Sequence, residues 1–441
     1  MLDVFRKIDN ILSSHSFSLE EDINKNASLI LADMEDGLNK RGLDELSSSS
    51  LAMLPTSFNP FIAREKTLSN TQNVIVIDLG GSNLRRALLS FDTEGKAIIS
   101  NESISTTFTK EKFDDYKDFF SSIAKYIAPF KGLSKKISFC FSYEASFLED
   151  GGAIALSLSK DFNVPNLKGK NIKTELYSTL LREGWEEDIN IFLLNDTLAT
   201  LAASLYIKTP PPSSYIALVL GTGLNVAYTE QTSANYKKDP RCIILEAGGF
   251  DKINMSYFDK MGIAQTKEGE HHILEKMCSA RYIGVLAKNI MKKLGEERLF
   301  SHKVASFFIN DSFSSLDSLW KGFNDFLLKE NKSSLSLCNL NVSLEEKDKN
   351  IIEYVLSLII SRTTNILLSL ILACYKKNEG TLQKDKPLFI MVEGSTVLKT
   401  HKMLSFLKDG LHEHISRAYS IPFILEKLKN STLIGSAIAI H

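Results

Sequence analysis

Cysteine is scarce in this sequence, and the five that occur are scattered at Cys140, Cys242, Cys278, Cys338 and Cys374. They form no CxxC pair and no zinc-ligand spacing, which excludes a disulfide framework and a structural zinc domain. We therefore expect reduced thiols and a cytoplasmic location. An excess of one charge is also missing, because 52 basic residues are balanced by 53 acidic ones, for a net charge of −1. Nothing in this balance favours nucleic acid or an anionic membrane as a partner.

Long apolar runs free of polar residues are absent as well. The longest apolar stretch, residues 351–375, is interrupted by two charged side chains, Glu353 and Arg362, and by three polar residues after them. It predicts a buried helix or helix pair rather than a membrane span. The charged first ten residues, MLDVFRKIDN, predict that no secretory signal is present. With 441 residues, of which 44% are apolar, the chain is long enough for two domains around a large core.

The common nucleotide signatures are lacking too, since neither GxxxxGK[ST] nor a GxGxxG that opens a helix occurs. In their place, residues 77–89 read IDLGGSNLRRALL, which predicts a strand, a tight glycine turn and a second strand. Gly80 and Gly81 let a phosphate approach the backbone N–H groups. Ser82, Asn83 and Arg85 surround them with polar groups, and a hydroxyl and a guanidinium are donors for an anion. Asp78 at the strand end can reach Mg²⁺, directly or through water.

A plain hairpin with a polar tip is the alternative interpretation of this motif. The Asp, Ser, Asn and Arg around the glycines favour a phosphate-binding hairpin instead. A phosphate clamp of this form suggests an actin-like ATPase fold, in which two such hairpins hold the phosphates from opposite domains.

Two further glycine turns follow predicted strands. Gly221, Thr222 and Gly223 come after the strand at 215–220, and Gly394 and Ser395 come after the strand at 389–392. Each turn alone could be ordinary, but three glycine turns with hydroxyls at strand ends favour a second set of phosphate contacts. LVLGTGLN at 218–225 also repeats the form of IDLGGSN at 77–83, as expected of a fold built from two related halves.

A carboxylate follows another predicted strand. The segment IFLLND ends in Asn195 and Asp196 and leads into a helix expected to start near Thr197. Active sites of α/β proteins gather at such strand ends. Asp196 could take the proton of a substrate hydroxyl that attacks phosphorus, or it could simply cap the helix, and this segment alone leaves both open.

The order of expected elements predicts α/β layers, because strands and helices alternate from residue 73 to residue 220. Residues 1–45 are expected to be amphipathic helix, with Ile30 and Met34 in the core. Residues 46–72 are expected to be irregular, with Pro55 and Pro60 as breakers. Residues 251–380 are expected to be mainly helical, and a last helix is expected at 432–440.

Eight segments, in order, resemble motifs of one family. They are MLPT (53–56), DLGGSNLR (78–85; family DLGGTNLR), FSYEASFLEDGGAIALSLSKDF (141–162; family FSYPxxQ…LxxWTKGF), FLLNDTLATL (192–201; family LVNDTVGTL), LGTGLNVAY (220–228; family GTGxNxxY), ILEAGGF (244–250; family NxEWGAF), EKMCSARYIGVL (275–286; family EKxxSGxYLGEL) and VEGST (392–396; family VDGSxY). By these segments the chain resembles the eukaryotic-type hexokinase family (hexokinases and glucokinases) of the actin-like ATPase superfamily.

The resemblance implies an α/β, two-domain actin-like ATPase (ribonuclease H-like) fold with an inter-domain active-site cleft. A small domain would comprise 73–200 plus 429–441, and a large domain 1–72 and 201–428. The implied activity is transfer of phosphate from ATP, with Mg²⁺, to the 6-hydroxyl of a hexose, with glucose expected and mannose or fructose as alternatives. The cleft would close on the sugar. The expected partner is a hexose, without nucleic acid or membrane; the oligomeric state is left open, and a monomer is compatible with the sequence.

The family motifs also imply roles for individual residues. Asp196 would be the general base, and Lys160 would stabilise developing charge. The sugar would be bound by Ser142, Ser159, Lys160, Asn195, Asp196, Asn225, Glu246 and Glu275. The nucleotide and its phosphates would be held by Asp78, Gly80, Gly81, Ser82, Asn83, Arg85, Gly221, Thr222, Gly223, Gly394 and Ser395, with Asp78 serving the Mg²⁺ through water.

Several positions depart from the family motifs. Glu144 stands where the family has proline, Asp161 adds a charge to the TKGF motif, and Glu393 replaces aspartate. The family's C-terminal glycine run, GSGKGAAL, is shortened, with only residues 435–437 matching its second half. These departures leave a catalytically weak or inactive hexokinase-like sugar sensor as the alternative, and an actin-like ATPase acting on a non-sugar partner as a third hypothesis.

Overall fold

The computed structural model describes residues 1–39, 49–66, 72–81, 83–156, 162–232, 239–266, 269, 271–310, 313, 315 and 318–440. The helices are α1 (Leu2–Ser14), α2 (Ile23–Asn39), α3 (Pro60–Lys66), α4 (Tyr116–Ile127), α5 (Ile172–Arg182), α6 (Asp196–Ala203), α7 (Tyr257–Ala264), α8 (Ile273–Cys278), α9 (Ala280–Glu296), α10 (His302–Ile309), α11 (Leu319–Leu328), α12 (Glu346–Asn378), α13 (Ser395–Lys399), α14 (Met403–Leu411) and α15 (Ser431–Ala439). The strands are β1 (Leu54–Pro55), β2 (Val74–Leu79), β3 (Leu84–Phe91), β4 (Ala97–Ser105), β5 (Lys136–Phe141), β6 (Ala145–Phe147), β7 (Ala153–Ala155), β8 (Asn190–Leu194), β9 (Ser214–Leu220), β10 (Leu224–Glu230), β11 (Arg241–Ile244), β12 (Ser334–Leu337), β13 (Leu340–Ser343), β14 (Leu388–Glu393) and β15 (Phe423–Glu426).

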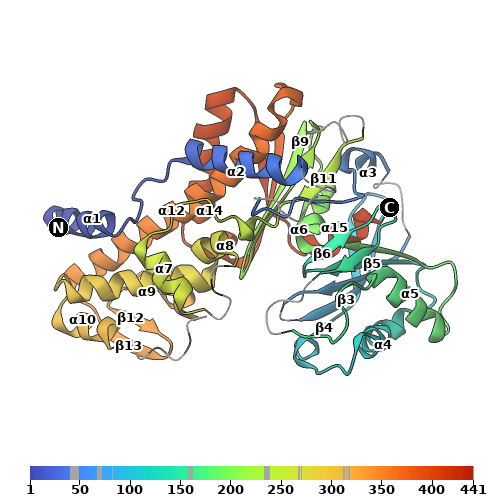
Figure 1. Ribbon diagram of the computed structural model, residues 1–441, viewed down its shortest axis with the longest axis horizontal. Coiled ribbons are helices and arrows are strands. Elements are labelled where there is room, and N and C mark those ends of the chain that lie inside the picture. Colours follow the sequence, from blue (N-terminus) through green and yellow to red (C-terminus); the bar gives the residue numbers. More distant parts are fainter. Residues whose placement is uncertain are drawn as a thin grey trace.

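Two mixed sheets with the same strand order organise the molecule (Figure 1). In the first sheet, β4-β3-β2-β5-β8, the first three strands are antiparallel and β5 and β8 run parallel to β2. The second sheet, β1-β11-β10-β9-β14-β15, repeats this pattern around β9 and adds β1 at its edge. The β2–β3 and β9–β10 hairpins therefore occupy equivalent places, as the echo between 77–83 and 218–225 predicted.

Helices α6 and α15 form a layer between the two sheets. Each follows the last strand of its own sheet, since α6 comes after β8 and α15 after β15. One buried cluster joins Val76 of the first sheet, Ala217 of the second, and Leu198 and Leu433 of the two helices. The helices cross closely at Gly435, where an added Cβ would overlap the carbonyl of Ala199. This pair is thus the packed connection between the two halves of the molecule.

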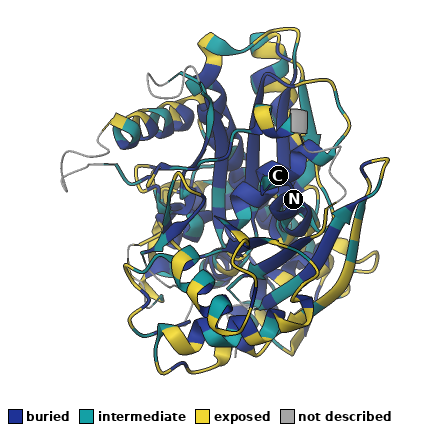
Figure 2. Ribbon diagram, turned by 90° about the vertical axis from the view of Figure 1, so that its right-hand side faces the viewer, coloured by how far each residue is buried: buried dark blue, intermediate teal, exposed yellow. Residues whose placement is uncertain are grey.

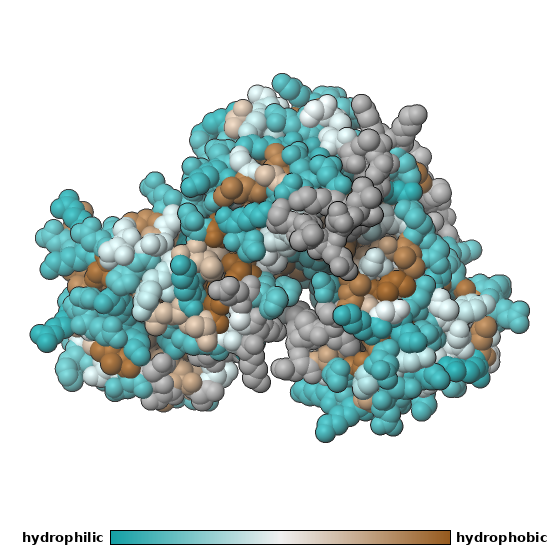
Figure 3. All heavy atoms as spheres, viewed as in Figure 1, coloured by the Kyte–Doolittle hydropathy of each residue, from teal (hydrophilic) through white to brown (hydrophobic). Residues whose placement is uncertain are grey.

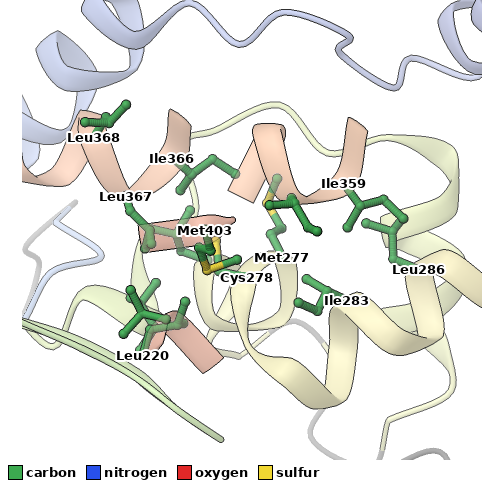
Figure 4. Close-up of a cluster of buried hydrophobic side chains, with 14 of the residues drawn as sticks. Leu220, Met277, Cys278, Ile283, Leu286, Ile359, Ile366, Leu367, Leu368 and Met403 are labelled. Atoms are coloured by element: carbon green, nitrogen blue, oxygen red, sulfur yellow. The ribbon is translucent and has the colours of Figure 1, made fainter. Parts of the chain in front are cut away.

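The second sheet is backed by the longest helix of the chain. In α12, 21 of 33 residues are buried, which confirms the buried helix expected for 351–375. By length and composition its stretch Glu346–Thr381 could cross a membrane, but 78% of the most apolar window is buried inside the protein. Figure 2 shows such buried residues in dark blue along the inner strands and helices. Figure 4 shows Ile359, Ile366 and Leu367 of α12 beside Met277 and Cys278 of α8.

One expectation about local structure needs correction. Pro60 does not break structure but begins α3, because proline lacks only an N–H that the first turn of a helix leaves unused. Residues 251–380 are mainly helical, as expected, and they also contain a short hairpin, β12–β13. Helix α6 begins at Asp196, beside the expected start near Thr197, and the side chain of Asn195 accepts a hydrogen bond from the Leu198 N–H at 2.7 Å. The helical expectation for 1–45 is confirmed by α1 and α2 over the described residues.

Candidate active site

A cavity of about 330 Å³ lies between the two sheets. Its wall includes Ser142, Tyr143, Glu144, Asn195 and Asp196 from the first half of the molecule, and Gly221, Thr222, Gly223, Asn225, Glu246 and Glu275 from the second. Such a volume suits a small polar ligand. In the space-filling view of Figure 3 the outline is notched between the two halves. Nine residues predicted from five separate motifs therefore meet in one place.

Asp196 reaches the cavity because strand β8 ends at Leu194, with only Asn195 between the strand and Asp196. Asn195 takes the N-cap position of α6, so its side chain, not that of Asp196, satisfies the free N–H of the helix. The interpretation of Asp196 as the helix cap is therefore wrong. The Asp196 carboxylate accepts a hydrogen bond from the Thr197 hydroxyl at 3.1 Å while facing the cavity.

The opposite wall carries Glu246 on a backbone in the left-handed region, with φ of 54°. Non-glycine residues pay a steric cost in that region, so the turn is held by its contacts. The Asn225 amide donates to the Glu246 carboxylate at 2.8 Å, and the Asn225 oxygen accepts from the Ala247 N–H at 3.3 Å. Burial raises the pKa of Glu246 to about 7, and the nearby carboxylates of Asp196, Glu144 and Glu275 add to that shift.

Glu275 enters the cavity from the short helix α8. Its carboxylate accepts a hydrogen bond from the Leu224 N–H at 3.2 Å, at the start of β10. The same helix is anchored from behind by Met277 and Cys278, which pack into the core beside α9 and α12 (Figure 4). The apolar core thus fixes the position of this cavity carboxylate.

Asp78 lies behind the cavity wall at the end of β2, directly opposite Arg85 on β3. Burial raises the pKa of Asp78 to about 6; Arg85 opposes the shift, and Asp196 adds to it. Asp78 and Asp196 are therefore close enough to interact electrostatically. The Thr432 hydroxyl at the start of α15 donates to Asp78 at 3.4 Å. Next to it, the Ser431 hydroxyl donates to Glu393 at 2.6 Å, so the first turn of α15 touches carboxylates from both sheets.

The three predicted glycine turns lie around this region. In the first, the Gly80 N–H donates to the Asn83 carbonyl at 3.0 Å, with Gly81 in the same turn, and the Tyr143 hydroxyl of the cavity wall donates to the Gly80 carbonyl at 3.3 Å. The second and third turns touch one another. The Thr396 hydroxyl donates to the Gly221 carbonyl at 2.7 Å, and a Cβ at Gly394 would overlap the Leu220 carbonyl. Only glycine fits there, and Ser395 begins α13 beside it.

These turns and Asp78 fit the binding of a nucleotide with Mg²⁺. Among the described residues no group of three or more His, Cys, Asp or Glu gathers to hold a metal ion. Mg²⁺ is commonly held by one or two carboxylates together with substrate phosphates, so a single carboxylate such as Asp78 is sufficient. The predicted residues Ser82, Ser159 and Lys160 lie outside the described residues.

Sequence motifs did not place every residue of the cavity wall. Ser50, Ala52 and His272 line it without having been predicted, and Glu144 was noted only as a departure from the family. Ser50 is held by the buried carboxylate of Asp33, which accepts from its N–H at 3.0 Å and its hydroxyl at 2.8 Å. In the sequence, the only indication that this segment lies near the site was the neighbouring motif MLPT at 53–56.

This chain is similar to known proteins over most of its length. Two family models, both described as hexokinase, match residues 7–206 and 215–441. Curated relatives include hexokinase-1 of Spinacia oleracea, 26% identical over 254 residues, which cover 52% of this chain and 50% of the relative. The hexokinase of Kluyveromyces lactis is 23% identical over 458 residues, which cover 92% of this chain and 86% of the relative. The first curated relatives are matched over only about half of their own length.

Among solved structures, the hexokinase from Schistosoma mansoni complexed with glucose matches with a TM-score of 0.76 and 21% identity. This match covers 100% of this chain and 99% of that one. It confirms the expected α/β actin-like fold.

None of the five cysteines forms a disulfide bond in the structure.

Proposed function

Because the chain belongs to the hexokinase family, we propose that it transfers the terminal phosphoryl group of ATP to the 6-hydroxyl of a hexose, most simply glucose. One observation carries this proposal. Asn195 and Asp196 from one half, and Asn225, Glu246 and Glu275 from the other, line a single cavity of about 330 Å³. A pyranose presents a ring of hydroxyls that both donate and accept, and carboxylates and amides can meet several at once.

Asp196 is proposed as the general base. It begins α6 at the end of a buried strand, so its backbone is fixed while its carboxylate faces the cavity. A carboxylate so placed can take the proton of the sugar hydroxyl as that oxygen attacks phosphorus. Ser142 on the same wall would help to orient the sugar, and the predicted roles of Ser159 and Lys160 remain part of the proposal.

The phosphates are proposed to lie against the glycine turns. Backbone N–H groups of 81–83 and 222–223 would approach them from opposite sheets, and Arg85 and Thr222 would add donors. Mg²⁺, which Asp78 would hold through water, neutralises phosphate charge when bound. Positioning and charge neutralisation are the main requirements of phosphoryl transfer.

Closure of the two halves on the sugar is part of the proposal. The cavity wall comes from both sheets, so a bound sugar would contact both and favour their approach. Exclusion of water would then direct the phosphate to the sugar rather than to hydrolysis.

The test is ADP release from Mg-ATP with glucose, mannose and fructose, each against a control without sugar. The Asp196→Ala variant is expected to keep calorimetric binding of the sugar but to lose about 10²–10⁴-fold in kcat. Retained turnover in this variant would refute the base assignment. ADP release that ignores the sugar would indicate an ATPase, and sugar binding without release would indicate the inactive sensor.

A further inference from the structure

Asp33 is a carboxylate in the middle of α2, and its side chain is fully buried. Its Oδ2 atom accepts three hydrogen bonds, from the N–H groups of Ser50 and Leu51, each at 3.0 Å, and from the Ser50 hydroxyl at 2.8 Å. Its Oδ1 atom pairs with the ammonium group of Lys252. Burial of a carboxylate is costly unless its oxygens are satisfied, so these contacts hold the carboxylate and its partners together. Helix α2 is thereby tied to two segments that lie far apart in the sequence.

Both of these segments form part of the cavity wall. In the first, Ser50 and Ala52 line the cavity, and in the second, Glu246 and Gly248 line it. The second segment continues to Lys252, the ion-pair partner of the buried carboxylate. The carboxylate itself lies outside the wall, so it can act on a ligand only through these two segments.

The two wall segments also contact one another directly. The carbonyl oxygen of Ser50 lies so close to Gly249 that an added Cβ there would come within 2.9 Å of it. The Ser50 hydroxyl accepts a hydrogen bond from the Asp251 N–H at 3.3 Å while it donates to the carboxylate in α2. The Ala52 N–H donates to the Leu245 carbonyl at 3.0 Å. The orientation of the Ser50 hydroxyl therefore links the buried carboxylate to the second wall segment.

Glu246 depends on this packing because its backbone conformation is unfavourable. Its φ of 54° lies in the left-handed region, and a non-glycine residue stays there only when the surrounding contacts fix it. Leu245 and Asp251, which lie on either side of Glu246 in the chain, are the residues that bond to 50–52. Loss of the support from α2 would therefore let this turn relax and would move the Glu246 carboxylate.

We propose that Asp33 is a positioning residue of the candidate sugar site, which holds residues 50–52 and 246–252 together so that Glu246 faces the sugar. This inference rests on the proposed sugar-kinase function and adds to it a residue that does not touch the ligand. The Asp33→Asn change keeps the shape of the side chain but replaces one acceptor oxygen with an amide group that donates. That amide would meet either the donors of Ser50 and Leu51 or the ammonium group of Lys252, so the wall would shift.

The experiment measures sugar binding and turnover in the wild type, Asp33→Asn, Lys252→Gln, Asp348→Asn and Glu94→Gln. Asp348→Asn is the matched control. Asp348 is also fully buried and accepts from the N–H and the hydroxyl of one serine, Ser301, at 2.8 and 2.7 Å, but it lies outside the cavity wall. Glu94→Gln is the surface control, because Glu94 is an exposed carboxylate on the turn between β3 and β4.

We expect Asp33→Asn to raise the calorimetric dissociation constant and the KM for glucose about tenfold, because a small displacement of a binding group is costly. The KM for Mg-ATP is expected to stay within about twofold of the wild type, because the phosphate turns do not depend on this contact. Asp348→Asn and Glu94→Gln are expected to keep all three constants within about twofold, even where Asp348→Asn lowers stability. An unchanged glucose dissociation constant in Asp33→Asn, or an equal rise in Asp348→Asn, would overturn the proposal.

Lys252→Gln decides the question if Asp33→Asn does not fold. It removes the ion pair but leaves the three hydrogen bonds at Oδ2 of Asp33. Because the Lys252 side chain is 36% exposed, solvent screens the pair, and the expected rise in the glucose dissociation constant is about threefold. A dissociation constant equal to that of the wild type would then overturn the proposal.

Failure of the proposed function remains distinguishable from failure of this inference. If no sugar supports ADP release from the wild type, the kinase activity is refuted, and the glucose dissociation constants alone test the role of Asp33. If glucose does not bind either, hydrogen–deuterium exchange of residues 245–251 replaces them. Faster exchange in Asp33→Asn than in Asp348→Asn would support the positioning role, and equal exchange would overturn it.

Discussion

At the scale of the single residue, the carboxyl group of Glu246 is held where its charge is disfavoured. Its pKa is about 7 in the folded protein against an ordinary value of 4.5, with burial as the main cause. Between these two pH values the folded state keeps a proton that the unfolded state has released. Stability from this group is therefore complete below about pH 4.5 and is lost as the pH rises through about 7. Asp78, raised from 3.8 to about 6, acts in the same direction.

The Glu246→Gln variant tests this linkage. From about pH 5 to about pH 8 the wild type is expected to lose about 2 kcal/mol more unfolding free energy than the variant, a value discounted because Glu246 is partly accessible from the cavity. Urea unfolding at both pH values measures the difference. The Glu94→Gln control is expected to keep the wild-type dependence, and identical dependence in Glu246→Gln would contradict the prediction.

Individual residues also show how far the sequence could predict the site. Asp196, Asn225, Glu246 and Glu275 could be named because each lies within a segment that resembles a motif of the family. Glu144 and His272 could not be assigned to the wall from local pattern alone, since their approach depends on how β6 and α8 pack across the two halves. Asn195, expected to bind sugar, also caps α6, a second role that only the structure shows.

At the scale of the element, the crossing of α6 and α15 is set by glycine. An added Cβ at Gly435 would overlap the backbone carbonyl of Ala199 and lie 2.9 Å from the Ala203 nitrogen. Because backbone atoms cannot swing aside, the helices would have to separate. Gly435→Ala is therefore expected to destabilise the protein by about 1–3 kcal/mol.

Thermal and urea unfolding of Gly435→Ala measure this cost. The matched control is Gly380→Ala, because a Cβ at Gly380 meets no atom within 4 Å. The control is expected to stay within about 0.5 kcal/mol of the wild type. Equal stability of the two variants would show that the crossing tolerates a wider separation.

Helices and strands were mostly predictable where the spacing of apolar residues and the neighbouring turn residues indicate the same element. The apolar run of β2 and the glycine turn after it specify a hairpin locally, and the structure has it at 74–91. The start of α3 at Pro60 and the β12–β13 hairpin were missed, because proline suits a first helical turn as well as a break and two four-residue strands carry little periodic signal.

At the scale of the whole molecule, the cavity lies between two halves that a sugar would bridge. Saturating glucose is expected to reduce the radius of gyration measured by small-angle X-ray scattering, and at about 100 times its dissociation constant to add about 2.7 kcal/mol of stability. The Glu246→Ala variant, impaired in sugar binding, is expected to show neither change. An unchanged radius of gyration in the wild type with saturating sugar would contradict closure. The domain boundaries at 73–200 plus 429–441, and at 1–72 and 201–428, stay a prediction.

The place of α15 has a consequence for how the protein is made. This helix, residues 431–439, covers strands β2, β3 and β5, which are translated hundreds of residues earlier. While the ribosome works through the intervening segments, α6 can already pack against the first sheet, but the cluster that includes Val74, Val76 and Cys140 still lacks the side chains of α15. The nascent chain must therefore keep a buried surface soluble until residues 431–439 emerge, which makes that interval the stage at which chaperones would be needed most.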